Sequence, residues 1–235
     1  MRISVTLSAN AGVAIDFGGK RIWVDALHEE KQPGFSAVTA SLQGKMLMAE
    51  AFQNPQYICY THCHGDHYSE KLTDAACKLW PKARVLAPEG KYRTFSGEEY
   101  TLEEDGLKIR YVKLPHEGEQ YHHVRHFGIL ISYQGVNLLI PGDCATGSET
   151  LCQAIGDTPI HLALLDFPWL ALRKGREFVL RHFADSKIVL YHLPFEADDT
   201  CGYRDAASRA VAATPQIGDL RLLMQPLQQE YFEIG

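Results

Sequence analysis

Short apolar runs separated by polar and glycine-containing segments recur along the chain. Such runs, rich in β-branched and aromatic residues, are typical of strands, whereas longer amphipathic stretches are typical of helices. The pattern predicts strands at residues 57–61, 83–87, 107–114, 127–132, 136–140 and 187–191, and another that begins at the first residues. It predicts helices at residues 69–80 and 176–183 and a polar loop at residues 90–104.

Two glycine-containing turns predict hairpins. Gly18 and Gly19 join two strand-like runs within residues 9–25, and Gln134-Gly135 separates the runs at 127–132 and 136–140. Pairs of this kind favour the tight turns that connect antiparallel strands.

The most informative segment is Thr-His-Cys-His-Gly-Asp-His, which ends at His67 and follows a predicted buried strand. Side chains on the loop after a buried strand lie where α/β folds build their sites. His62 and His64, two apart on extended backbone, would point the same way. Asp66 and His67 follow a flexible glycine and can turn elsewhere. The pattern predicts one metal at His62 and His64 and a neighbouring metal at Asp66 and His67.

A cation also explains why these side chains are clustered. Packing several imidazoles and a carboxylate together has a desolvation and electrostatic cost unless a cation is present. A lone histidine is usually a core or surface residue, but this cluster favours a metal site.

The H-x-H-x-D-H pattern resembles the signature of the metallo-β-lactamase superfamily. The resemblance implies an α/β fold, a four-layer αββα sandwich, in a single domain over residues 1–235 with two similar halves at about 1–105 and 106–235. The opening segment AGVAIDFGGKRIWVDAL most resembles the branch that contains the ascorbate-6-phosphate lactonase. The likeness covers the motif framework over most of the chain and does not reach the loops that determine substrate.

The resemblance assigns roles to three more strand-end residues. Asp25 matches the first motif, in which an aspartate supports the metal loop without being a ligand. Asp143, after Pro141-Gly142, matches the carboxylate that bridges both metals. His192 matches the last histidine ligand, which belongs to the second metal.

The third motif is ambiguous because four histidines are available: His116, His122, His123 and His126. We favour His116 as the metal ligand because it lies at the end of the strand predicted at 107–114. His122 is the alternative, since its spacing to the following Phe-Gly resembles that of the tRNA-processing members. The loop at 117–125 departs from the compact third motif of the lactonase branch.

Nitrogen and oxygen ligands suit zinc, and we predict two zinc ions. The same ligand types also bind iron and manganese. Two adjacent metals lower the pKa of a shared water toward about 7, which generates hydroxide at neutral pH. We therefore predict a hydrolase that acts on a small ester, lactone or phosphoester, with catalytic roles for Asp66, Asp143 and His192. His64 occupies the position where flavodiiron oxidoreductases carry glutamate, which weighs against redox chemistry.

Two alternatives are a phosphodiesterase or nuclease of the same fold and a metal-binding scaffold without catalysis. The net charge of −6 and the absence of a long basic run weigh against a nucleic-acid partner. We expect a small-molecule substrate, and the loop histidines not used as ligands could bind it if it is anionic. A short basic segment at residues 173–176 could bind a phosphate or carboxylate at a helix start.

Composition predicts a cytoplasmic enzyme. With 235 residues, 46% of them hydrophobic, the chain can bury a sizeable core as one domain. No apolar run approaches the roughly 20 residues of a membrane span, and the start lacks the apolar region of a signal peptide. The six cysteines contain no C-x-x-C pair and predict reduced thiols. A cytoplasmic location argues against β-lactamase activity.

Overall fold

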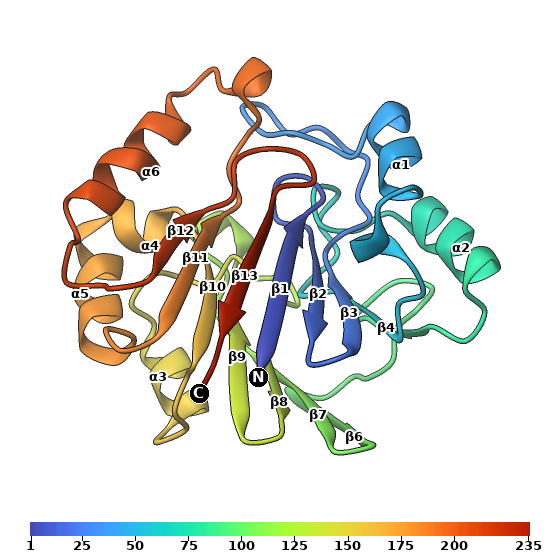
Figure 1. Cartoon of the computed structure of the whole chain (residues 1–235), viewed down its shortest axis with the longest axis horizontal. Coiled ribbons are helices and arrows are strands. Elements are labelled where there is room, and N and C mark those ends of the chain that lie inside the picture. The colour runs from blue at the N-terminus through green and yellow to red at the C-terminus, as the bar shows by residue number, and fades with distance from the viewer. The chain divides into compact units, whose positions relative to one another are not determined.

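Two β-sheets, each with its own helices, make up the chain (Figure 1). The computed structural model describes residues 1–235. Unit 1 comprises Met1–Ser96, His192–Cys201 and Leu223–Gly235, and unit 2 comprises Gly97–Tyr191 and Gly202–Leu222. The halves expected from the sequence are contiguous, whereas both compact units are assembled from separate segments.

The sheet of unit 1 has six strands in the order β13-β1-β2-β3-β4-β5. Its strands are β1 Arg2–Leu7, β2 Val13–Phe17, β3 Lys20–Val24, β4 Tyr57–Cys59, β5 Arg84–Leu86 and β13 Gln229–Glu233. Strands β13, β1, β2 and β3 pair antiparallel, whereas β3, β4 and β5 are parallel. The carboxyl ends of β3 and β4 therefore meet at one edge, where the predicted metal-binding motif begins.

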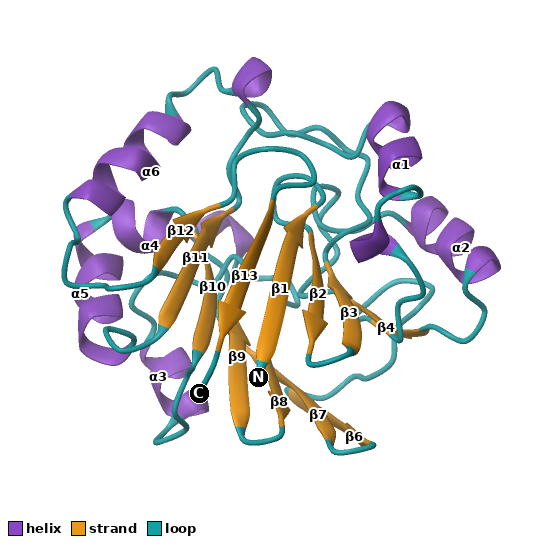
Figure 2. Ribbon diagram, viewed as in Figure 1, coloured by secondary structure: helices purple, strands orange, loops and turns teal.

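The helical segments of unit 1 are α1 Ala40–Met46, α2 Glu70–Leu79 and the 3-10 helices η1 Glu50–Phe52 and η3 Glu196–Asp198. Helices α1 and α2 lie beside β3 and β4 (Figure 2). Their buried faces, which include Leu42 and Leu72, pack with Trp23 of β3 and Ile58 of β4 in one apolar cluster.

The sheet of unit 2 has seven strands in the order β12-β11-β10-β9-β8-β7-β6. Its strands are β6 Glu99–Glu104, β7 Leu107–Lys113, β8 Phe127–Tyr133, β9 Val136–Ile140, β10 Leu162–Asp166, β11 Lys187–Tyr191 and β12 Leu220–Leu222. Strands β6 to β9 form an antiparallel meander, and β9 to β12 are parallel. The central parallel strands β10 and β11 are nearly continuous apolar runs, as expected for strands buried on both faces.

The helical segments of unit 2 are α3 Glu149–Ile155, α4 Pro168–Ala171, α5 Arg173–His182, α6 Tyr203–Ala212 and the 3-10 helix η2 Glu119–Tyr121. Trp169 of α4 and Phe178 of α5 pack edge-on at 5.3 Å between ring centroids. They belong to an apolar cluster with Leu165 of β10 and Leu190 of β11, so these helices cover the parallel half of the sheet.

Both predicted hairpins are confirmed. Gly18 and Gly19 form the turn between β2 and β3 with φ angles of 61° and 88°, a conformation that glycine adopts without strain. Asp16 Oδ1 accepts a hydrogen bond from the Gly19 N–H at 2.7 Å, which closes the turn. Gln134 and Gly135 connect β8 and β9 in the same way.

The loop predicted at residues 90–104 is partly wrong, because its last six residues form β6. This strand lies at the edge of its sheet, and Leu102 is its one buried residue. An edge strand with polar side chains lacks the apolar signal from which strands are recognised. The helix predicted at 176–183 also begins three residues earlier, at Arg173. None of the helices combines the length and the apolar character needed to cross a bilayer.

Candidate metal centre

Asp25, the residue after β3, anchors the loop that carries the predicted ligands. Its Oδ1 accepts a hydrogen bond from the Thr61 N–H at 2.8 Å, and its Oδ2 accepts one from Thr61 Oγ1 at 2.6 Å. Asp25 is fully buried and has a positive φ of 51°. The loop after β4 is therefore tied to the end of the neighbouring strand before it reaches the histidines.

The same carboxylate orients His67. His67 Nδ1 lies 3.0 Å from Asp25 Oδ2, so the imidazole donates its Nδ1–H to the carboxylate. This tautomer directs the Nε2 lone pair away from Asp25, which is how carboxylates prepare histidines that bind metals. The supporting role that the resemblance implied for Asp25 agrees with this geometry.

The ring of His67 faces His192. Their Nε2 atoms are 3.3 Å apart, and both side chains are buried. His192 directly follows β11 and has a φ of 57°, a left-handed conformation that turns the chain back toward the β1–β2 connection.

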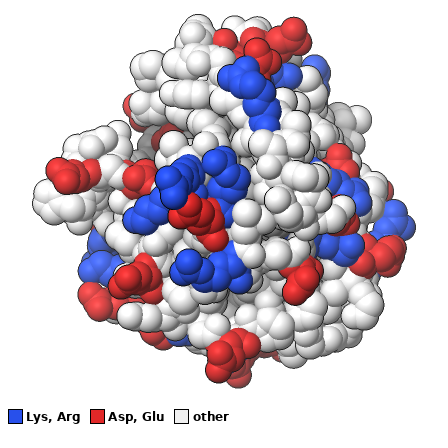
Figure 3. All heavy atoms as spheres, turned by 90° about the vertical axis from the view of Figure 1, so that its left-hand side faces the viewer, with Lys and Arg blue, Asp and Glu red and all other residues white.

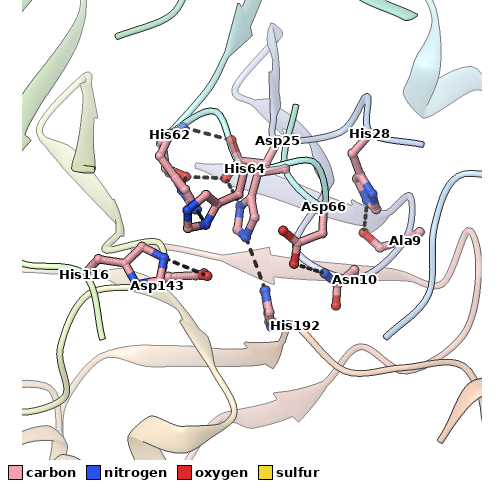
Figure 4. A network of polar contacts seen from close by, with 12 residues as sticks. Ala9, Asn10, Asp25, His28, His62, His64, Asp66, His116, Asp143 and His192 are labelled. Carbon is pink, nitrogen blue, oxygen red and sulfur yellow. Dashed lines mark hydrogen bonds and ion pairs between the residues drawn. The ribbon is translucent and has the colours of Figure 1, made fainter. Parts of the chain in front are cut away.

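Asp66, His67 and His192 form a compact donor set within unit 1. Two of them, Asp66 and His192, are labelled in Figure 4. One ligand atom from each lies within 4.8 Å of the other two, and all three residues are buried. A buried group of two imidazoles and a carboxylate has the chemistry and spacing to hold a divalent cation. This set fits the second metal that the sequence predicts.

His62 and His64 also converge, as their alternation on extended backbone predicted. His62 Nε2 lies 3.0 Å from His64 Nδ1, and Thr61 Oγ1 contacts His62 Nδ1 at 3.0 Å. The Thr61 hydroxyl thus contacts both Asp25 and His62.

In unit 2, the two remaining predicted ligands form a pair. His116 Nε2 lies 3.6 Å from Asp143 Oδ2. The His116 Nδ1–H donates to the Glu117 carbonyl at 2.7 Å, which leaves Nε2 to face the carboxylate. The Glu117 N–H in turn donates to the Asp143 carbonyl at 2.8 Å, and His116 forms an isolated bridge with Cys144. Asp143 follows β9 through Gly142, whose φ is 60°.

The other third-motif candidates have different surroundings. His122 and His123 are exposed, and the His122 Nδ1–H donates to the Glu119 carbonyl at 2.9 Å at the end of η2. His126 is fully buried, and its Nδ1 contacts the Leu114 carbonyl at 3.2 Å. His116 is thus the one whose ring is paired with Asp143 in the structure.

Sequence reasoning missed Asn10 and His28. Asn10 Nδ2 donates to Asp66 Oδ2 at 3.4 Å, and the Asn10 carbonyl accepts from the His192 N–H at 3.2 Å. His28 donates from Nε2 to the Ala9 carbonyl at 3.0 Å, and burial lowers the pKa of His28 to about 4, which keeps the ring neutral. The sequence carried only a turn-like Asn-Ala-Gly at this point, with no indication of what it contacts.

All six cysteines are outside disulfides. Burial raises the pKa of the Cys63 thiol to about 12 and also raises that of Cys144, so both remain protonated at neutral pH. This state suits packing residues, as expected for Cys63.

Charged side chains of both signs are interleaved on the surface. Figure 3 shows a group of Lys and Arg side chains with acidic side chains among them. In the predicted basic segment, Arg173 Nε pairs with Glu177 at 2.7 Å and Arg176 donates to the Leu170 carbonyl at 2.9 Å. Two of its three cations therefore have local partners.

No protein-family model matches the sequence, and no curated protein sequence matches it significantly. Solved structures do resemble it. A structure from Veillonella parvula, described as a possible metal-dependent hydrolase, is 12% identical with a TM-score of 0.70, over 97% of this chain and 98% of that one. A metallo-β-lactamase fold protein from Bacillus subtilis is 11% identical with a TM-score of 0.67, over 98% and 99%.

A diiron β-hydroxylase from Streptomyces venezuelae is 12% identical with a TM-score of 0.62, over 99% of this chain and 54% of that one. Structures similar to this chain are therefore described with different reactions, as is common for widely used folds. The likeness at these identities concerns the fold. The chain is a mixed α/β protein with the metallo-β-lactamase fold.

Proposed function

We propose that the protein is a hydrolase that binds two zinc ions and uses them to activate water for attack on a small ester, lactone or phosphoester. The observation that carries this proposal is the buried donor set of Asp66, His67 and His192, with Asp25 hydrogen-bonded behind His67. The names of several similar structures, which describe metal-dependent hydrolases, support the reaction class.

We assign the first ion to His62, His64 and His116. Asp66, His67 and His192 would hold the second, and Asp143 is the further carboxylate that the motif resemblance assigns to the metal site. When bound, two adjacent cations lower the pKa of water and stabilise negative charge on the reacting group.

Two hydrogen-bond acceptors of the chain determine which ring nitrogen of His67 and of His116 carries the proton. Asp25 holds a proton on His67 Nδ1, and the Glu117 carbonyl holds one on His116 Nδ1. In each ring, Nε2 is therefore kept as the unprotonated nitrogen that a cation requires. Burial of Asp66, His67 and His192 excludes bulk water and strengthens each electrostatic interaction.

A small-molecule substrate suits the surface charge better than a nucleic acid does. Nucleic-acid binding depends on cations that are available to neutralise phosphates. Here the basic side chains Arg173, Lys187 and Arg221 are paired with Glu177 and Asp219 at 2.7 to 2.9 Å.

The proposal is tested by measuring bound metal and hydrolysis together. We expect two equivalents of zinc per chain in the purified protein and turnover on at least one member of an ester, lactone and phosphodiester panel. Two equivalents of iron in place of zinc would change the metal assignment. Turnover on phosphodiesters alone would identify a phosphodiesterase or nuclease, and two equivalents without any turnover would identify a scaffold.

Replacing the third-motif histidines one at a time tests the ligand assignment. His116→Ala should lose one metal equivalent and lower kcat/KM by about 100-fold or more, because outer partners of ligands alone contribute about 10- to 100-fold. His122→Ala is the matched control and should behave like the wild type, because its ring is exposed and bonded to Glu119. A large loss in His122→Ala with none in His116→Ala would show the assignment to be wrong.

A further inference from the structure

The turn at residues 8–12, between β1 and β2, places one side chain against the proposed second metal site. Asn10 is fully buried. Its side-chain Nδ2 donates to Asp66 Oδ2 at 3.4 Å, and its backbone carbonyl accepts from the His192 N–H at 3.2 Å. Asn10 also forms an isolated antiparallel bridge with Leu193. One residue thus contacts two of the three members of the donor set (Figure 4).

Hydrogen bonds within the turn and from His28 hold the backbone of the turn in place. The Ser8 N–H donates to the Gly12 carbonyl at 2.8 Å, and the Gly12 N–H donates to the Ala9 carbonyl at 2.8 Å. The same Ala9 carbonyl accepts the Nε2–H of His28, which is fully buried. These contacts fix the position of the backbone from which the Asn10 side chain extends.

Asn10 has two energetic costs, in its backbone and in its side chain, that are unusual for a residue whose only role is packing. Its φ of 48° is left-handed, which costs free energy for any residue except glycine, although asparagine tolerates it best. Its Oδ1 is buried without a hydrogen-bond partner, and its one side-chain hydrogen bond is long. Buried polar atoms are nearly always satisfied, so such a residue requires an explanation beyond stability.

The chemistry of an amide explains why asparagine occupies this position. Nδ2 must face Asp66 because a carboxylate accepts and cannot donate when it is ionised. The amide is neutral, so it orients the carboxylate without forming an ion pair that would compete with a cation for its charge. A lysine or arginine in this place would oppose cation binding, and an aliphatic residue would leave Asp66 Oδ2 without this contact.

We infer that Asn10 is a positioning residue of the second metal site. Its amide orients Asp66 and its backbone carbonyl fixes His192, so both ligands point toward the cation. This inference rests on the proposed function, because it requires that Asp66 and His192 bind metal.

The test removes the side chain without straining the backbone. Asn10→Gly keeps the left-handed conformation, which glycine adopts freely, and deletes the amide. Asn54→Gly is the matched control, because Asn54 also has a positive φ, of 49°, and is exposed. Asn10→Ser, whose hydroxyl is too short to reach Asp66, is a second variant in case Asn10→Gly does not fold. Circular dichroism of the metal-free proteins checks folding.

Zinc affinity is measured by competition with a chelator, and the two equivalents are resolved separately. In Asn10→Gly we expect one of the two equivalents to lose about 10- to 100-fold in affinity, the usual effect of losing a partner of a metal ligand, while the other is unchanged. Asn54→Gly should bind both equivalents as the wild type does.

Three results would contradict the inference in different ways. Wild-type affinities in Asn10→Gly would remove the role of Asn10 alone. An equal loss at both equivalents would indicate a general structural defect and would also remove it. A wild-type protein that binds no zinc would overturn the proposed function together with this role, whereas zinc binding without hydrolysis would overturn the proposed function and leave the role of Asn10 intact.

Discussion

At the scale of single residues, close contacts determine which side chains are tolerated around the loop at residues 61–67, which carries the predicted ligands. Asp25 accepts hydrogen bonds from Thr61 through both its carboxylate oxygens and from His67. A fully buried carboxylate needs such partners, because desolvation of a charge is costly. The backbone of the same residue lies against Gly12. A Cβ at Gly12 would lie 2.7 Å from the Asp25 carbonyl oxygen and 2.2 Å from Ser8 Oγ.

Gly12→Ala should therefore destabilise the protein by about 1–3 kcal/mol, the usual cost of overpacking a buried site. Gly44→Ala is the control, because Gly44 is exposed within α1 and nothing lies within 4 Å of an added Cβ. Alanine should stabilise a helix interior there by up to about 1 kcal/mol. Both free energies of unfolding are measured with denaturant. Equal stability of the two variants would contradict the role of the close approach.

At the scale of elements, the start of α2 determines where the loop at residues 61–67 ends. Ser69, two residues after His67, caps the helix: its Oγ accepts from the Leu72 N–H at 3.2 Å and donates to Glu29 Oε1 at 2.8 Å. The Ser69 N–H donates to the Leu27 carbonyl at 2.8 Å, which joins the helix start to the segment after β3. The loop is thereby fixed at both ends, by Asp25 before the histidines and by this cap after them.

Ser69→Ala should cost about 1 kcal/mol in the free energy of unfolding, because it leaves a helix N–H without its capping acceptor. Ser69→Thr should recover part of this loss, because its hydroxyl can both accept from the Leu72 N–H and donate to Glu29. Ser208→Ala in α6 is the control: Ser208 is exposed and bonds only to the Arg204 carbonyl one turn earlier. Alanine favours the interior of a helix, so this change should be neutral or slightly stabilising. A loss in Ser208→Ala as large as that in Ser69→Ala would show that the cap is not the cause.

At the scale of the whole molecule, the proposed metal site predicts that metal binding and folding are coupled. Buried histidines and carboxylates that converge without a cation carry a desolvation cost, and a cation that binds only the folded state removes it. Stability should therefore depend on metal concentration.

Zinc at about 100 times its dissociation constant should stabilise the metal-free protein by roughly 2.7 kcal/mol for one site, which corresponds to roughly 5–10 °C in Tm for a chain of this size. Magnesium is the control and should produce little shift, since it prefers oxygen ligands in octahedral geometry. Scanning calorimetry after chelator treatment measures both. A Tm that does not respond to zinc would contradict a metal site formed by folding.

Local patterns were enough to determine much of the molecule. The strand before the motif, both hairpins and helix α2 follow from the periodicity of residues that are close in sequence. The pairing of His62 with His64 follows from alternation on extended backbone, and the fold was expected from the resemblance of the H-x-H-x-D-H pattern to the metallo-β-lactamase signature.

Only the tertiary structure decided features that depend on distant segments. Strand β6 is polar because it lies at a sheet edge, and an edge position is a property of the sheet and not of the strand. Strand β13 returns from the end of the chain to pair with β1. Asn10 contacts Asp66 across 56 positions of sequence, and His28 supports it through a backbone carbonyl. The sequence by itself predicted the candidate metal ligands, whereas their supporting contacts depend on where the folded backbone brings a buried donor beside an acceptor.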